Sequence, residues 1–135
     1  MLLLDTHVLL WLLDGNPTLS DPVRRKIETD GQERTLFVSA ISFWEIGLLA
    51  RAGRINLFEE ANRWVADAIG RTGSQVTPFT PEIAIQTSLL PGQFHKDPAD
   101  RILVATARAL GAALATRDRL IHAYAAQGHL SVLAV

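Results

Sequence analysis

The 135-residue sequence predicts an α/β fold in which a central parallel sheet of four to five short strands is flanked by helices. Short apolar runs of β type alternate with helical patterns, and strands separated by helices form parallel sheets covered on both faces. The runs at residues 2–4 (LLL) and 36–38 (LFV) are continuously apolar, which is typical of strands buried on both sides. With 48% hydrophobic residues and no linker-like stretch, the chain fits one domain over residues 1–135.

The first four predicted elements lie within residues 2–39. A strand at residues 2–4 precedes helical patterns at 7–13 and 21–29, and a second strand is predicted at 35–39. In parallel sheets of this kind, the ligand crevice lies beyond the carboxyl ends of the strands. Asp5 follows the first strand directly, so we expect it at that edge of the sheet.

The middle of the chain predicts a helical clip at about residues 42–72, made of helices at 42–52 and 58–72. The second helix places four apolar side chains on one buried stripe: Phe58, Ala61, Val65 and Ala68. We expect Trp11, Trp44 and Trp64 to pack in the core, although an exposed tryptophan in the clip would suit a partner helix.

The last part of the chain continues the alternation. Asp97 followed by Pro98 is typical of a helix N-terminus. The predicted elements are a strand at 75–77, helices at 81–90 and 98–110, a strand at 112–115, a helix at 119–126 and a strand at 130–133.

Composition excludes several classes of protein. The apolar start, MLLLDTHVLLWLLD, lacks a preceding positive charge and is interrupted by Asp5, so it fits neither a signal peptide nor a membrane span. The chain has no cysteine, which excludes disulfides and thiolate metal sites. We expect a cytoplasmic protein without membrane contact. The net charge of −1 does not by itself indicate nucleic-acid binding.

Four carboxylates occupy similar places near the predicted strand ends. Asp5 and Asp118 follow strands, whereas Glu45 shares a helical stripe with Leu48 and Leu49, and Asp100 lies on the apolar face of its helix. If the four converge, neighbours about 5 Å apart would repel by roughly 3 kcal/mol per pair. No arginine or lysine lies on either inward stripe, so a bound cation is indicated. Oxygen ligands without clustered histidine or cysteine favour Mg²⁺ or Mn²⁺, which activate water against phosphate esters.

Structural roles for the acids stay open at this stage. Ser42 and Glu45 fit a capping box, and the helix dipole favours Asp100 in a first turn. Asp118, taken alone, fits a turn or cap. Thr116 could hydrogen-bond locally or contact a substrate.

Three segments together resemble the PIN-domain ribonucleases, specifically the VapC-type toxins of bacterial toxin–antitoxin pairs. They are LLDTHVLLWLL, VSAISFWEIGLLARAGRINL and HKDPADRILVATARALGAALATRD, and the similarity covers nearly the full chain. The resemblance implies a PIN-like fold and endonucleolytic RNA cleavage with one or two Mg²⁺ or Mn²⁺ ions. It implies that the catalytic metal ligands are Asp5, Glu45, Asp100 and Asp118, with Asp97 assisting from an outer position.

The resemblance also implies a cognate antitoxin that covers the active site, and a toxin homodimer. For RNA contact, the candidates that adjoin a proposed metal ligand are Arg101, Arg117 and Arg119, and Thr116 is a further candidate. His7 lies close to Asp5, but metal-activated water makes a protein base dispensable, so we assign His7 no catalytic role.

Two other functions compete with this interpretation. A haloacid dehalogenase-like phosphatase would form a covalent intermediate on the first aspartate. It would require a second aspartate where this chain has His7, and a lysine that residues 38–93 lack. The other function is a catalytically idle module whose metal site stabilises the fold or docks a partner, and the complete set of four acids argues against it.

Overall fold

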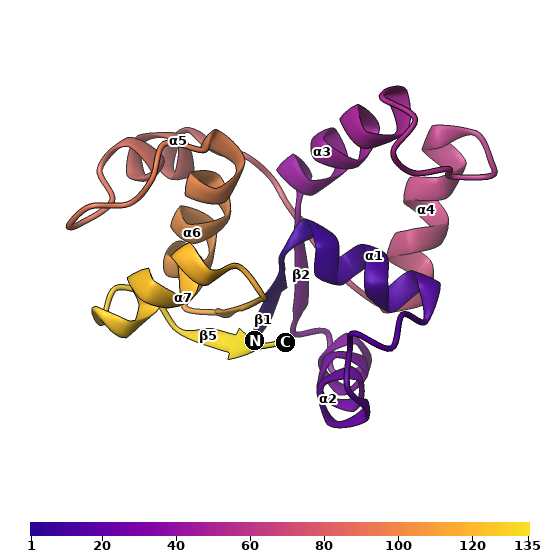
Figure 1. Cartoon of the computed structure of the whole chain (residues 1–135), viewed down its shortest axis with the longest axis horizontal. Helices are drawn as coiled ribbons and strands as arrows, with labels where there is room; N and C mark the ends of the chain where they lie inside the picture. Colours follow the sequence, from indigo (N-terminus) through magenta and orange to yellow (C-terminus); the bar gives the residue numbers. More distant parts are fainter.

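A sheet of five parallel strands lies at the centre of the computed structural model, which describes residues 1–135 (Figure 1). The strand order is β3-β2-β1-β4-β5, so the first strand of the chain is the middle strand of the sheet. Leu3 lies opposite Phe37 on one side and Leu114 on the other. The strands are β1 (Leu2–Leu4), β2 (Leu36–Ser39), β3 (Gln75–Thr77), β4 (Ala113–Thr116) and β5 (Val132–Ala134). This architecture confirms the predicted fold class.

Seven helices cover the two faces of the sheet (Figure 1). One face carries α1 (Thr6–Asp14), α2 (Asp21–Gln32), α3 (Ala40–Arg51) and α4 (Ala61–Thr72). The other face carries α5 (Pro81–Ser88), α6 (Pro98–Leu110) and α7 (Arg119–Ala126). Every boundary lies within three residues of its predicted position. No helix combines the length and the apolar character that crossing a bilayer would need.

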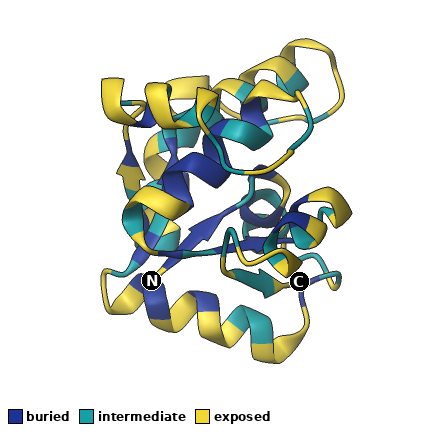
Figure 2. Ribbon diagram, turned by 90° about the vertical axis from the view of Figure 1, so that its left-hand side faces the viewer, coloured by how far each residue is buried: buried dark blue, intermediate teal, exposed yellow.

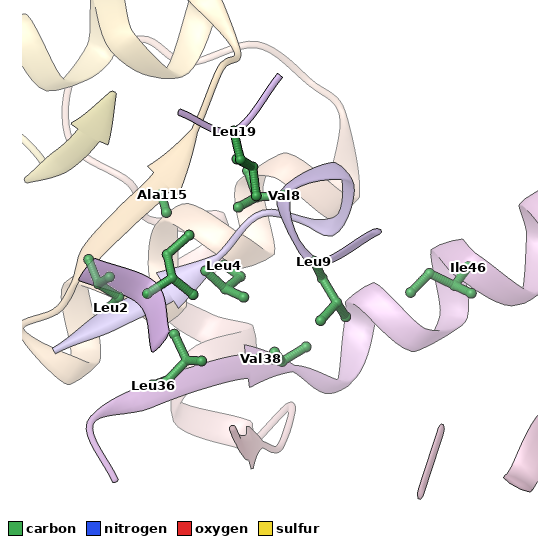
Figure 3. Packing of buried hydrophobic residues seen from close by; sticks show 10 residues of the cluster. Leu2, Leu4, Val8, Leu9, Leu19, Leu36, Val38, Ile46 and Ala115 are labelled. Carbon is green, nitrogen blue, oxygen red and sulfur yellow. The ribbon is translucent and has the colours of Figure 1, made fainter. Parts of the chain in front are cut away.

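The sheet divides the hydrophobic core into two parts because successive strand residues point to opposite faces. Leu2 and Leu4 pack with residues of α1, α2, β2 and α3. Figure 3 shows those of α1, β2 and α3. Leu3, between them, packs on the other face with Leu103 of α6 and Tyr124 of α7. In Figure 2 the strands at the centre are largely buried, and exposed residues lie on the outer sides of the helices. Burial on both faces explains why the first strand shows no polar alternation.

The start of α4 differs from the prediction. Phe58 adopts a left-handed backbone conformation with φ of 60°, and its N–H donates to Asn56 Oδ1 at 2.8 Å. The helix then begins at Ala61, with the Glu60 carboxylate accepting hydrogen bonds from the backbone at its first turn. Phe58 is therefore 88% exposed, and Ala61 is also exposed, so their predicted burial is wrong, whereas Ala68 is buried. The hydrogen bond to the Asn56 side chain and the cap at Glu60 determine where α4 begins, and the spacing of apolar residues does not.

The three tryptophans divide between core and surface. Trp11 and Trp64 are partly buried against the cluster between the sheet and α1–α4, as predicted. Trp44 on α3 is 56% exposed, so its predicted core position is wrong. The clip formed by α3 and α4 thus presents an aromatic side chain to solvent.

Helices α2 and α4 approach each other closely at Gly31. A Cβ atom at this position would lie 2.2 Å from the carbonyl oxygen of Thr72. Only a residue without a side chain allows this contact, which holds the C-terminal end of α4 against α2.

Candidate metal centre

The acidic residues gather at the carboxyl ends of β1, β2 and β4, where four helices begin. Asp5 caps α1, Asp97 caps α6 and Asp118 caps α7, each by accepting hydrogen bonds from backbone N–H groups of its helix. The N-terminal end of a helix carries partial positive charge, which favours nearby anions. The fold therefore places acids where backbone dipoles partly offset their charge. The predicted capping role of Asp97 is confirmed.

Asp5 is held by two hydrogen bonds, one to each carboxylate oxygen. Oδ1 accepts from the backbone N–H of Thr6 at 2.7 Å, and Oδ2 accepts from Thr116 Oγ1 at 2.6 Å. The Thr116 hydroxyl also accepts from the backbone N–H of Asp118 at 3.0 Å. Thr116 is fully buried, and its hydroxyl connects the Asp5 carboxylate to the backbone N–H of Asp118 inside the protein. Of the two roles considered for Thr116, the structure supports the local hydrogen bond.

Glu45 reaches the same region from α3. Its Oε1 accepts a hydrogen bond from Thr6 Oγ1 at 2.6 Å, and the same hydroxyl lies 2.9 Å from Ser42 Oγ. The N-cap of α3 is Ser39, whose hydroxyl accepts from Ile41 N–H, so the capping-box hypothesis is wrong. Because the helix begins earlier, Ser42 faces the protein interior instead of capping.

The buried face of α3 is also rotated relative to the predicted stripe. Ser42 and Ile46 are buried, whereas Leu48 is 46% exposed. Glu45 lies half-buried at the margin of this face. The glutamate points toward the other acids all the same.

Asp100 lies in the first turn of α6, on the face that buries Leu103, Val104 and Ala107, as predicted. Its Oδ2 is 3.1 Å from Nε2 of His95. One ligand atom from each of His95, Asp100 and Asp118 can be chosen so that all three lie within 4.8 Å of one another.

His95 was missed by sequence reasoning, and the expectation that no histidine joins the acids is wrong. The only signal is its place five residues before Asp100 in HKDPAD. These residues form a loop without periodicity, so the sequence does not show that the imidazole turns back toward α6.

Burial and mutual repulsion raise the pKa values of three of the acids. The pKa of Asp100 rises to about 7, mainly through burial and further through the charges of Asp97, Asp5, Asp118 and Glu45. Burial also raises the pKa of Asp5, against the opposing hydrogen bonds from Thr116 and Thr6. The pKa of Glu45 rises for the same reason, with the Thr6 hydrogen bond opposing. The four acids thus influence one another, as expected if they converge.

The acids have no arginine or lysine partner. The ion pairs of the protein join Asp30 to Lys26 and to the N-terminal amine, and Asp100 to His95. Both cap hydrogen bonds to Asp118 use Oδ1, which leaves Oδ2 without a hydrogen bond. Concentrated carboxylates with raised pKa values, no arginine or lysine counter-charge and a free oxygen fit a divalent cation, which takes oxygen ligands.

The arginines near the acids differ in their surroundings. Arg101 is half-buried and donates to the carbonyl oxygens of Thr87 at 2.9 Å, Phe94 at 3.1 Å and His95 at 3.4 Å. Arg101, a candidate for RNA contact, is therefore turned toward the protein, and Ala105 in the next turn of α6 is buried. Arg101 holds the loop before α6 instead of facing outward.

Arg117 and Arg119 are exposed. Arg117 lines a cavity of about 230 Å³ together with Asp5, His7, Trp11 and Asp118 among others. The cavity thus brings the guanidinium of Arg117 and two of the acids to one opening. His7 is exposed at the same opening.

Comparisons with known proteins agree with this arrangement. The family model described as PIN domain matches residues 2–127. The chain is 34% identical to Ribonuclease VapC22 of Mycobacterium tuberculosis over 122 residues. The aligned region covers 90% of each protein.

Solved structures share the fold. A chain in the crystal structure of VapBC2 from Rickettsia felis, bound to a DNA fragment from their promoter, superposes with a TM-score of 0.70 at 15% identity, covering 98% of this chain and 97% of that one. A chain of a toxin–antitoxin complex from Klebsiella pneumoniae superposes with a TM-score of 0.60 at 18% identity, covering 87% of each.

Proposed function

The chain belongs to the PIN-domain family, among its VapC-type members, and from this premise we propose that it is a divalent-metal-dependent endoribonuclease that hydrolyses RNA phosphodiester bonds. The single observation that carries the proposal is the convergence of Asp5, Glu45, Asp100 and Asp118 without an arginine or lysine counter-charge. The naming of the Mycobacterium tuberculosis relative as a ribonuclease supports RNA as the substrate.

The residues divide into metal-holding and substrate-holding groups. Asp5, Asp100 and Asp118 offer carboxylates to one or two Mg²⁺ or Mn²⁺ ions, and Glu45 offers a fourth from α3. Such an ion, when bound, activates water for attack on phosphorus and neutralises the charge that develops there. Thr116 and Thr6 keep Asp5 and Glu45 in place through their hydroxyls.

Substrate contact falls to the exposed arginines. Arg117 lines the cavity beside Asp5 and is suited to a phosphate of the RNA backbone, and Arg119 lies close by in the chain. The occupied hydrogen bonds of Arg101 and the burial of Thr116 leave both out of the proposed RNA-contacting set.

Cleavage of purified RNA by the purified protein tests this function. We expect cleavage with Mg²⁺ or Mn²⁺, none with EDTA, and loss of cleavage in Asp5→Asn. His7→Ala should retain cleavage because no protein base is required. An inactive wild-type protein that still binds the ions would instead support an idle docking module, and an acid-stable phosphoprotein after incubation with a phosphomonoester would support the phosphatase.

We further propose that the protein is the toxin of a type II toxin–antitoxin pair and that its cognate antitoxin binds the clip formed by α3 and α4. The likeness to a chain of a toxin–antitoxin complex supports such a partner. The clip exposes Trp44 at 56%, Leu48 at 46% and Phe58 at 88%, an apolar surface suited to an amphipathic antitoxin segment. Trp44→Ala should weaken binding of the purified antitoxin in calorimetry, whereas Arg25→Ala on α2 should not.

A second copy of the chain is proposed to bind at the edge formed by β3 and α5. β3 is an edge strand, and the exposed apolar residues there are Val76, Phe79, Ile85 and Leu89. Exposed apolar surface of this kind marks interaction sites. Sedimentation equilibrium should give a dimer for the wild type and a monomer for Ile85→Glu. A monomeric wild type would refute this part of the proposal.

A further inference from the structure

The His95 imidazole contacts the acids through a polar atom that is shielded from solvent. Nε2 is buried and makes no aligned hydrogen bond, although Asp100 Oδ2 lies only 3.1 Å away. A buried polar nitrogen without a hydrogen bond destabilises the folded protein. We therefore ask which hydrogen bond His95 Nε2 makes when an ion is bound beside Asp100.

The other ring nitrogen identifies which tautomer is present. Nδ1 accepts a hydrogen bond from the backbone N–H of Asp97 at 3.4 Å. An acceptor nitrogen carries no proton, so in the neutral ring the proton lies on Nε2. In this tautomer the nitrogen that faces Asp100 is a donor, so binding of a metal by that nitrogen would require the ring to lose the Nε2 proton.

The loop that carries His95 is fixed on both sides. The Arg101 guanidinium donates to the carbonyl oxygens of Phe94 and His95. The Phe94 ring lies 4.3 Å from the His95 ring and 4.8 Å from the Tyr124 ring, measured between centroids. Tyr124 in turn donates through its hydroxyl to the carbonyl oxygen of Pro91 at 2.5 Å. The imidazole is thus held beside Asp100 by packing that does not involve an ion.

We propose that His95 is a positioning residue: when the divalent ion is bound, its Nε2–H donates to Asp100 and orients that carboxylate for the ion, without itself binding the ion. The inference rests on the proposed metal-dependent function. Partners that hydrogen-bond a metal ligand fix its orientation, and their loss typically weakens metal binding about 10–100-fold. His95 would thereby set the ion affinity of a site whose ligands are all carboxylates.

Two substitutions separate donation from packing. In His95→Gln the side-chain amide nitrogen can take the place of Nε2 and still donate to Asp100, whereas His95→Leu has no donor there. His129→Leu is the matched control, because His129 lies 4.7 Å from Tyr124 in the same row of rings but is not among the groups that contact Asp100. Mn²⁺ affinity is measured by calorimetry and by electron paramagnetic resonance of the free ion.

We expect His95→Leu to weaken Mn²⁺ binding about 10–100-fold, and His95→Gln and His129→Leu to stay within about threefold of the wild type. Unchanged binding in His95→Leu would overturn the proposal, and so would an equal loss in His95→Gln and His95→Leu. Thermal denaturation of each variant in EDTA shows whether a loss reflects unfolding, and the rescue by glutamine would not occur if His95 served only to pack the loop.

Nitrogen-15 NMR of the imidazole provides a measurement that does not depend on cleavage. We expect the pattern of a protonated Nε2 and an unprotonated Nδ1 both without ion and with saturating Mg²⁺. Loss of the Nε2 proton on adding Mg²⁺ would make His95 a direct ligand and overturn the proposal. If the wild type binds neither ion, the proposed function and this inference fail together, whereas intact binding in the wild type and in His95→Leu refutes the inference alone.

Discussion

Asp100→Asn should stabilise the ion-free protein at neutral and higher pH. The folded protein raises the pKa of this carboxyl from 3.8 to about 7, mainly because the group is buried and then because four other acids lie near it. Above this pKa the wild type folds with an unfavourable charge, which asparagine lacks. The substitution removes a proposed metal ligand and relieves repulsion at the same time.

The size of the effect follows from the two pKa values. A change from 3.8 to about 7 corresponds to at most about 4 kcal/mol at pH values above both. The side chain is 21% exposed, and solvent screens part of the interaction, so we expect about 2 kcal/mol. Because the folded state holds the proton more tightly than the unfolded state, this contribution to wild-type stability is present below the unfolded pKa. It is lost as the pH rises from about 4 to about 7.

Urea denaturation in EDTA measures this difference. Between about pH 4.5 and about pH 8, the free energy of unfolding of Asp100→Asn relative to wild type should increase by about 2 kcal/mol. Asp14→Asn, an exposed acid at the end of α1, should show no comparable increase. Adding Mn²⁺ at the higher pH should stabilise the wild type and leave Asp100→Asn largely unaffected. Equal stability of wild type and Asp100→Asn at both pH values would refute the reasoning.

Three further predictions follow from contacts of the fold. Thr116→Val removes the hydroxyl that donates to Asp5, so Mn²⁺ affinity measured by calorimetry should fall about 10–100-fold. An unchanged affinity would exclude a positioning role for this hydroxyl. In Arg101→Lys the ammonium group cannot reproduce the planar set of hydrogen bonds to three carbonyl oxygens. This variant should be destabilised by about 1–3 kcal/mol, and a protease should cleave the loop before α6 faster. Equal protease resistance of variant and wild type would contradict the prediction. In thermal denaturation, Gly31→Ala should lower the melting temperature strongly because its Cβ would strike the backbone carbonyl of Thr72. The control Gly47→Ala meets no atom within 4 Å and should raise the melting temperature slightly through better helix propensity. Similar shifts in both variants would show that α2 and α4 can separate.

The order of elements could be predicted because burial leaves a clear pattern in the sequence. Leu2, Leu3 and Leu4 are apolar since both faces of β1 are covered, and the inward face of α6 is readable from Leu103, Val104 and Ala107. The four acids could be found because each interrupts or flanks such a pattern. Their convergence then follows from the rule that parallel strands end at one edge of the sheet.

Features set by single hydrogen bonds could not be predicted in this way. The Asn56 side chain turns the backbone at Phe58, and no apolar spacing reports that turn. The carbonyl groups that draw Arg101 inward belong to a loop whose path is fixed only by tertiary packing. The same loop carries His95 to Asp100, so the histidine was missed for the same reason that the arginine was misplaced.

The position of β1 in the middle of the sheet has a consequence for synthesis of the protein. β1 leaves the ribosome before the other four strands, yet one of its two neighbours is β4, and the hydrogen bond from Thr116 to Asp5 spans 111 residues of chain. Contacts this distant in sequence form only after the intervening chain is available. A nascent or prematurely terminated polypeptide that stops before β4 lacks Thr116 and Asp118, so it cannot form the proposed metal site.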